Sequence, residues 1–496
     1  MNEIYDIGRT GLSVKELLSK VESGTVVTEN TDTALDANSI KPISNGTVTE
    51  ALSKKIDEAE ADKRYMKQSQ IPETSDGYWY GVEWNTAVAS TAMTRIGNME
   101  LHRTLPVQNG MRGCLLDDDG NVVAYLPSSS WEGATLDGSK GQVMVEIPEH
   151  YRKFEEVGTI RRCKISTYPY AGYHRVPKMY ISAYEATVQR STSKLCSVKN
   201  SSADYRGGTN TSAWDGTYRT LLGRPLSVVS RTNLRLYARK RNIATTEWNC
   251  LDYNAYKAVF WLYYVEYANR NCQLAFNAEK DVNGYAQGGL GNGATTLTNE
   301  EWVAYNNESP FIPCGYTDEL GNGSGEVAYD LHNSDGSIVK TVMVSRYRGI
   351  ENIFGHLASI MDGVNIIDNP TSANGGNDTT VIFTATATEA YSDDSNAGYA
   401  AVGTGMRAAG YVRQLIFGDG GEILPSLGGG GTAVYWADYH YTSISGLTSA
   451  QLRACSVGGH ARSGAQGGLA YIIAGTPPSS SSKTNGSRLC FIPTNK

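Results

Sequence analysis

The sequence has 496 residues, a formal net charge of -7 and 19% charged side chains. This length is enough for several domains, and the acidic balance provides no positive field for nucleic acid. No run approaches the roughly eighteen apolar residues of a membrane span, so we expect no membrane insertion. The 53 glycines and 31 tyrosines favour a strand-and-loop architecture with an aromatic surface.

Residues 1–76 are predicted to form an N-terminal attachment and trimerisation segment. Thr47, with Glu50 three positions later, is a capping box that begins a helix extending to about Lys67. Such a narrow apolar stripe cannot be buried by one helix alone, so the helix either packs on the rest of the chain or self-associates. We favour a parallel oligomer because the segment is highly charged and terminal.

Residues 77–165 are predicted to form a small β-rich domain. The run of three aspartates and a glycine at 117–120 is a turn signal between strand candidates at 114–116 and 121–126. Further strands are expected at 143–147 and 159–165, because branched and aromatic residues dominate there.

Residues 166–496 are predicted to form a larger, loop-rich domain, which makes the overall fold class α+β. A strand is expected at 179–188, and a helix at 252–270 has Asp252 as its N-cap and an aromatic stripe that we assign to core packing. The glycine-rich segments that follow are interrupted by short strand candidates at 339–345, 379–385 and 432–436.

The stretch 453–493 is rich in glycine, small residues and proline, so we expect neither a continuous helix nor a long strand there. We predict a long loop held at both ends by apolar segments. Within it, eight positions share no period and no chemistry, as expected of exposed side chains on a fixed backbone: His460, Arg462, Ser463, Ile473, Gly475, Thr476, Ser480 and Ser482. An ordinary Gly/Ser-rich terminal loop is the alternative.

The residues that could carry chemistry form no catalytic or metal-binding pattern. The eight cysteines are dispersed without a CxxC pair, which favours buried thiols over zinc binding or redox chemistry. No closely spaced histidine pair is present, and we assign His356 a structural hydrogen-bonding role. The aspartates at 117–119 and 393–394 suit turn capping, with calcium as the alternative ligand. We therefore expect no enzyme and no cofactor.

Three segments, at 177–190, 345–366 and 453–491, resemble the C-type-lectin-fold domain shared by formylglycine-generating enzymes and the variable proteins of diversity-generating retroelements. The closing motif NGSRLCF at 485–491 is the most specific part of this resemblance. The enzyme branch of the family uses a reactive cysteine pair near the end of the domain. Cys455 and Cys490 stand far apart in the sequence, so the resemblance to that branch does not extend to catalysis.

The variable-protein branch implies a variable region at about 455–490, in which asparagine codons are rewritten at adenines. All eight irregular positions can be reached from AAC in this way, whereas Gln466 and Lys483 cannot. The resemblance therefore implies that these eight side chains bind ligand. Four nearby aromatic residues are expected to add constant contacts: Tyr435, Trp436, Tyr439 and Tyr441.

The front of the chain is similar to phage tail fibres, in a helical segment at 41–67 and a strand segment at 141–154. This similarity implies a homotrimeric receptor-binding protein, attached to other tail proteins through its N-terminal segment, that binds a glycan or protein receptor on the host bacterial surface. Its expected location is the virion tail, after synthesis in the host cytoplasm without a signal peptide. The alternatives are a diversified protein displayed on a bacterial surface and an enzyme of the formylglycine-generating type.

Overall fold

The computed structural model describes residues 71–306, 310–370 and 378–494. Contacts along the chain define Asp76–Lys496 as one compact unit. The predicted helix that begins at Thr47 lies outside the described residues, as does the rest of the proposed trimerisation segment up to residue 70.

The fold is predominantly β, with 37% of residues in strands and 12% in helices, so the α+β prediction was wrong. Small and polar stretches that we expected to be loops pair into a large sheet instead. Backbone hydrogen bonding between strands does not require large side chains, and neighbouring strands supply the burial that a glycine-rich segment cannot supply alone.

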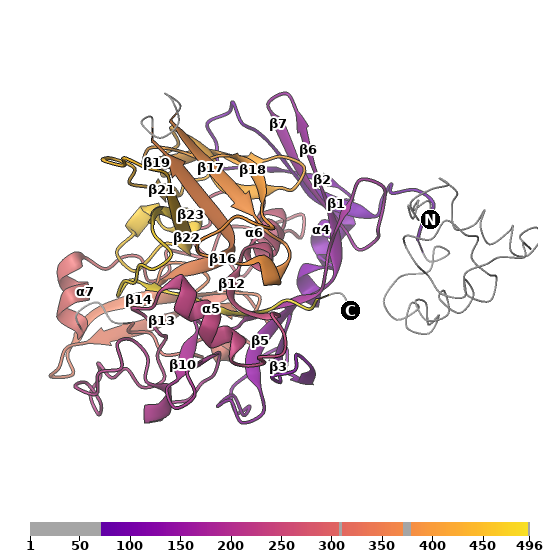
Figure 1. The fold of residues 1–496 in the computed structure, drawn as a ribbon. Coiled ribbons are helices and arrows are strands. Elements are labelled where there is room, and N and C mark those ends of the chain that lie inside the picture. The colour runs from indigo at the N-terminus through magenta and orange to yellow at the C-terminus, as the bar shows by residue number, and fades with distance from the viewer. Residues whose placement is uncertain (1–70, 307–309, 371–377, 495–496) are drawn as a thin grey trace, which may run out of the picture. The chain divides into compact units, whose positions relative to one another are not determined.

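Two larger sheets make up most of the architecture (Figure 1). A five-stranded sheet has the order β2-β1-β7-β6-β8, with β1 (Trp79–Asn85), β2 (Thr94–Gly97), β6 (His150–Val157), β7 (Ile160–Ser166) and β8 (His174–Val176). The main path of a fifteen-stranded sheet is β20-β19-β21-β23-β22-β16-β12-β25-β9-β5-β3-β4. Residues 77–165 therefore contribute strands to both sheets.

The strands of the large sheet are β3 (Arg112–Leu116), β4 (Val122–Tyr125), β5 (Gln142–Ile147), β9 (Met179–Ser182), β12 (Trp248–Asp252), β16 (Ala358–Asn369), β17 (Thr379–Thr384), β18 (Ala400–Thr404), β19 (Gly410–Phe417), β20 (Glu422–Gly428), β21 (Tyr439–Tyr441), β22 (Gln451–Gly458), β23 (Gly468–Thr476), β24 (Asn485–Gly486) and β25 (Leu489–Phe491). Two small sheets contain β10 (Thr187–Gln189) with β11 (Lys194–Cys196), and β13 (Gly325–His332) with β14 (Ile338–Tyr347) and β15 (Ile350–Glu351). The α-helices within the described ranges are α4 (Met99–Thr104), α5 (Arg231–Arg239), α6 (Tyr253–Tyr267) and α7 (Asn299–Asn306).

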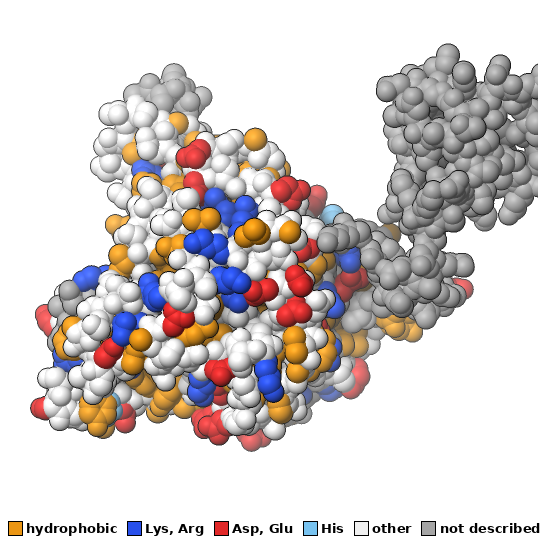
Figure 2. Space-filling model, turned by 60° about the horizontal axis from the view of Figure 1, so that its bottom comes forward, with side chains coloured by type: hydrophobic (Ala, Val, Ile, Leu, Met, Phe, Trp, Pro, Cys, Tyr) orange, Lys and Arg blue, Asp and Glu red, His pale blue; other side chains and the backbone are white. Residues whose placement is uncertain are grey.

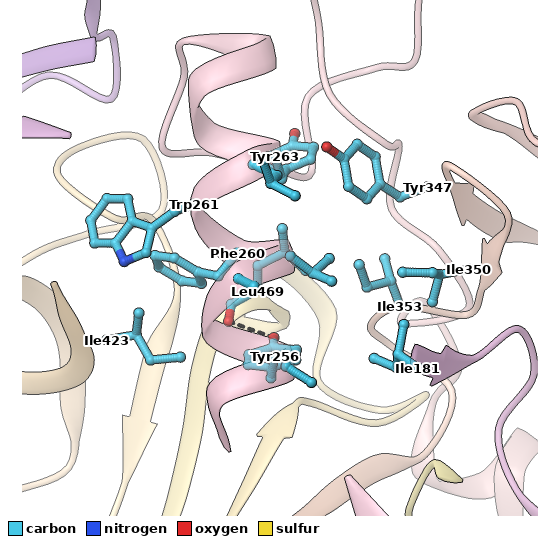
Figure 3. Packing of buried hydrophobic residues seen from close by; sticks show 14 of the residues in the cluster. Ile181, Tyr256, Phe260, Trp261, Tyr263, Tyr347, Ile350, Ile353, Ile423 and Leu469 are labelled. Carbon is cyan, nitrogen blue, oxygen red and sulfur yellow. Dashed lines mark hydrogen bonds between the residues drawn. The ribbon is translucent and has the colours of Figure 1, made fainter. Parts of the chain in front are cut away.

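Helix α6 forms the centre of the core and confirms the predicted helix and its N-cap. The Asp252 carboxylate accepts hydrogen bonds from the backbone N–H groups of Asn254 (2.8 Å) and Ala255 (3.0 Å), which satisfies two donors that a helix start leaves free. Aromatic side chains of α6 extend in several directions into the core (Figure 3). The Tyr256 hydroxyl donates to the Leu469 carbonyl at 2.7 Å, so the helix fixes the start of β23.

Several other predicted elements can be compared with the structure. The hairpin around 117–120 is confirmed as β3 and β4, whereas the strand expected at 179–188 is divided into β9 and β10. The expected strand at 432–436 is wrong, because this segment forms turns, with Tyr435 in the left-handed region at φ 58°. The segment 453–493 is not one long loop: it includes most of the eight-residue strand β22 and all of the nine-residue strand β23.

Buried polar groups follow the sequence expectations more closely. All eight cysteines are buried and unpaired with one another, as predicted. His356 is a buried hydrogen-bonding residue: its Nδ1 lies 2.5 Å from Glu185, and its Nε2 accepts from the backbone N–H of Phe311 at 3.2 Å.

In the chain as described, no helix is both long and apolar enough to cross a membrane. Figure 2 shows acidic and basic side chains interspersed on the face that it presents.

Candidate functional site

The candidate site is built on strand β23, whose side chains alternate between the core and the opposite face of the sheet. Ala470, Ile472 and Ala474 are buried in the core that contains α6. Since successive side chains on a strand point to opposite faces, Tyr471, Ile473 and Gly475 share the other face. Of these, Ile473 and Gly475 are partly exposed.

Strand β21 extends this face with two tyrosines. It runs parallel to β23 with Tyr441 beside Ile473, and antiparallel to β19 with Tyr439 opposite Tyr411. The rings of Tyr411 and Tyr439 pack edge to face with centroids 5.2 Å apart. Tyr441 is 48% exposed, whereas His440, which lies between the two tyrosines of β21, points inward and is buried.

We call this surface the tyrosine face and define it by four residues that are at least partly exposed: Tyr411, Tyr439, Tyr441 and Ile473. Tyr471 is on the same side of β23 but is only 5% exposed. Burial raises the pKa of Tyr411 and of Tyr471, and nearby tyrosines add to both effects. These hydroxyls are therefore neutral at physiological pH and can donate and accept hydrogen bonds. Sequence analysis did not identify Tyr411, because only strand register shows which tyrosines become neighbours.

The loop between β22 and β23 carries three of the predicted variable residues and is tightly organised. The Ser463 hydroxyl accepts from the His460 backbone N–H at 2.9 Å, and the Ser463 N–H donates to the His460 carbonyl at 2.8 Å. Ser463 is only 7% exposed. Ser463 therefore shapes the loop.

The other two variable residues of this loop are half-buried. Arg462 donates from its guanidinium to the Asn299 side chain and lies over the Trp302 ring, 6.0 Å from its centroid. Burial, followed by the charge of Arg462, lowers the pKa of His460 to about 4, so this imidazole is neutral at physiological pH. The loop thus presents one cationic side chain beside uncharged groups.

The remaining variable positions lie at the end of β23 and in the segment after it. A side chain at Gly475 would start 2.9 Å from the backbone nitrogen of Ser443, closer than Cβ atoms normally approach. Thr476 is partly exposed opposite Ala454, and Ser480 is also partly exposed. Ser482 supports its own turn, since its hydroxyl lies 2.8 Å from the Thr484 hydroxyl.

Tyr435 and Trp436 do not belong to the exposed surface. Trp436 is 1% exposed and packs against Trp84 and Tyr264, with ring centroids 5.7 and 5.2 Å apart. Tyr435 is 8% exposed. Of the four constant aromatics predicted from the sequence, the structure therefore places Tyr439 and Tyr441 on the tyrosine face and the other two beneath the surface.

The groups considered for chemistry are occupied structurally. Within the ranges that the structure describes, no three His, Cys, Asp or Glu side chains are grouped so as to hold a metal ion. In the turn at 117–120, the Asp117 carboxylate accepts from the backbone N–H groups of Asp119 and Asn121. Burial raises the pKa of the Cys455 thiol to about 12 and also raises that of Cys490, opposite to the shift of a reactive cysteine.

An open groove of about 730 Å³ lies between the β3–β4 turn, the loop before β5 and the β10–β11 hairpin. Its charged side chains are largely paired with one another, since Asp118 contacts both Lys194 (2.7 Å) and Arg241 (3.0 Å). It is a weaker candidate than the tyrosine face, because its polar groups already have partners.

Comparison with known proteins leaves the family open. No family model matches the chain, and no curated protein is similar to it.

Proposed function

We propose that this chain is the receptor-binding protein of a phage tail fibre, with a C-type-lectin fold, and that it recognises the host bacterial surface through the tyrosine face and the adjoining loop at 459–467. The receptor would be a glycan or a protein. Binding requires no catalysis, and the side chains of this surface would determine which receptor is recognised.

The observation that carries the proposal is the alternation along β23. One set of its side chains is fixed in the core against α6, while Ile473 and its neighbours face outward. Substitution at an outward position can therefore change the surface without removing core contacts. The neighbouring tyrosines supply a large contact area at low conformational cost.

The predicted variable positions are not equally suited to diversification. Arg462, Ile473, Thr476 and Ser480 are partly exposed, and a new side chain there has access to solvent. Ser463, Ser482 and Gly475 are restricted by the contacts described above, and we infer that they vary little. Receptor specificity would then depend mainly on the first group together with His460.

Two other functions are less well supported. An enzyme of the formylglycine-generating type needs a reactive cysteine, and burial raises the pKa of both Cys455 and Cys490. A diversified protein displayed on a bacterial surface would use the same binding surface. Genes for tail assembly or for an export system beside this gene distinguish that protein from a tail fibre.

Diversification itself is tested on the flanking DNA. A near-copy of codons 455–490 beside a reverse transcriptase gene, differing only at adenines, is the expected result. A flanking region without such a repeat contradicts diversification and leaves the surface as a fixed binding site.

The binding surface is tested with a matched pair of tyrosines. Tyr441 on β21 is 48% exposed, and Tyr125 on β4, the last strand at the other end of the sheet order, is 44% exposed. We expect Tyr441→Ala to reduce binding of the full chain to host cells at least tenfold, whereas Tyr125→Ala leaves it unchanged. Equal effects of the two substitutions would contradict the proposed surface.

The proposed homotrimer is tested by sedimentation equilibrium of the full chain. One chain has a mass of 53.7 kDa, and three times this value is expected. Trimerisation would raise the avidity of individually weak sites, since linked sites bind at a high effective concentration. The mass of a single chain at micromolar concentration would exclude the trimer but not the binding surface.

A further inference from the structure

A buried arginine beneath the candidate site has no acidic partner among the residues that the structure describes. Arg270 follows α6, is 1% exposed, and donates from its backbone N–H to the Thr91 carbonyl at 2.7 Å. Its Nη2 donates to the Ser90 carbonyl at 2.5 Å. Among the ion pairs of the described residues, none includes Arg270.

Aromatic rings surround this guanidinium. Its Cζ lies 6.0 Å from the ring centroid of Trp84 and 5.8 Å from that of Trp436, and these two indoles pack edge to face. Tyr264 contacts Trp436 from another side. Ring faces compensate a cation only in part, because they cannot accept directed hydrogen bonds as oxygen or a halide can.

Three polar atoms in this region have no hydrogen-bond partner in the part of the chain that the structure describes. They are Nε and Nη1 of Arg270 and the hydroxyl oxygen of Tyr264. The ionisable groups that act electrostatically on Arg270 are Tyr264 and Tyr435, both neutral in their ordinary state. Burial lowers the pKa of Arg270 to about 10, so the guanidinium still carries its charge at neutral pH.

The chemistry of these groups specifies what could satisfy them. The arginine nitrogens can only donate, the Tyr264 hydroxyl, which acts electrostatically on Arg270, can also donate, and the site carries one positive charge. A buried charge without a counter-charge is unfavourable, as is a buried donor without an acceptor. A hydrogen-bond acceptor with a single negative charge would supply both the missing counter-charge and the missing acceptor.

We propose that Arg270 and Tyr264 bind a small monovalent anion of the halide class, such as chloride, beneath Tyr435 and Trp436. The backbone N–H of Tyr435 donates at 3.2 Å to the Ser90 carbonyl, the same oxygen that accepts from Arg270. The anion therefore stabilises the segment that leads into β21 and the tyrosine face. This site is independent of the identity of the receptor.

Bromide provides a direct test, because its anomalous scattering identifies it in a crystal. Crystals of the full chain soaked in sodium bromide should show an anomalous peak within about 3.5 Å of Nε or Nη1 of Arg270, the range of a long hydrogen bond. A crystal that shows bromide elsewhere but a water or nothing at Arg270 overturns the proposal.

Thermal melts give a second readout in solution. At equal ionic strength, the full chain should have a Tm about 3 °C higher in chloride than in gluconate. Gluconate serves as the comparison because this anion is too large to enter the site. Tyr264→Phe retains the ring and should reduce this difference, and Arg270→Met should abolish it. Arg241→Met, which removes an arginine that already has an acidic partner, should retain the difference. A chloride effect that persists in both Arg270→Met and Tyr264→Phe contradicts the site.

Discussion

Replacement of Trp436 by alanine separates a core role from a receptor-binding role at this position. The indole is almost fully buried and contacts Trp84, Phe260 and Tyr264. A buried tryptophan removes about 200 Å² from water, which at about 25 cal/mol per Å² corresponds to roughly 5 kcal/mol. A compact denatured state reduces this value by about a quarter. We therefore expect Trp436→Ala to lower the free energy of unfolding by about 4 kcal/mol.

The assay is urea denaturation of the full chain followed by far-UV circular dichroism, so that loss of one indole does not alter the signal. Tyr441→Ala is the matched comparison, and we expect its effect on stability to stay within about 0.5 kcal/mol, as at most surface positions. The same two proteins are then tested for binding to host cells. A loss below about 1.5 kcal/mol for Trp436→Ala would refute the core assignment, because full burial would then have little energetic consequence.

Further substitutions at four positions test the site and its surroundings. Gly475→Asn should destabilise the protein by about 1–3 kcal/mol, because its Cβ would meet the Ser443 backbone, and Thr476→Asn should not; equal midpoints in urea would contradict this restriction. Ser463→Ala should cost about 1 kcal/mol through its lost hydrogen bond to His460, measured the same way. Burial lowers the pKa of His440 to about 4, so the folded state resists protonation and stability is lost as pH falls below about 6.5. From pH 7 to 5 this residue should account for about 2 kcal/mol, which His440→Phe should remove from the pH dependence of unfolding.

Local signals in the sequence predicted local structure well. The capping aspartate and aromatic stripe predicted α6, and the run of aspartates before Gly120 predicted the β3–β4 hairpin. These features depend on neighbours within a few residues, which the sequence contains directly. The predicted core role of the aromatic stripe also holds, since α6 is buried on all sides except at Asn254.

Features that depend on distant segments could not be predicted in the same way. The stretch at 453–493 has few large side chains, so its composition indicated a loop. Strand β22 nevertheless pairs with β16 and β23, and β25 pairs with β9 from more than three hundred residues earlier, with Cys490 opposite Ile181. A central strand needs partners on both edges more than it needs strand-forming residues, and the partners cannot be identified from the strand itself.

The candidate site depends on the same non-local information. Tyr439 and Tyr441 were predicted as contacts together with Tyr435 and Trp436, because all four are near the variable region in the sequence. The turns at 432–436 bury the Trp436 indole, however, while β21 exposes Tyr441. Strand register distinguishes the two exposed tyrosines of β21 from the buried Trp436. Parallel pairing places Tyr441 beside Ile473, and antiparallel pairing places Tyr411 opposite Tyr439.

Register also explains how the proposed binding surface could change its ligand. A residue in the middle of a β-sheet has its backbone hydrogen bonds satisfied by neighbouring strands, whatever side chain it carries. At Ile473, the inward neighbours on β23 retain the core contacts, so the outward side chain contributes little to folding and can contribute much to binding. At Gly475, the closeness of the Ser443 backbone removes that freedom. The positions able to determine specificity are thus those where the space beyond Cβ is open, and sequence irregularity alone does not identify them.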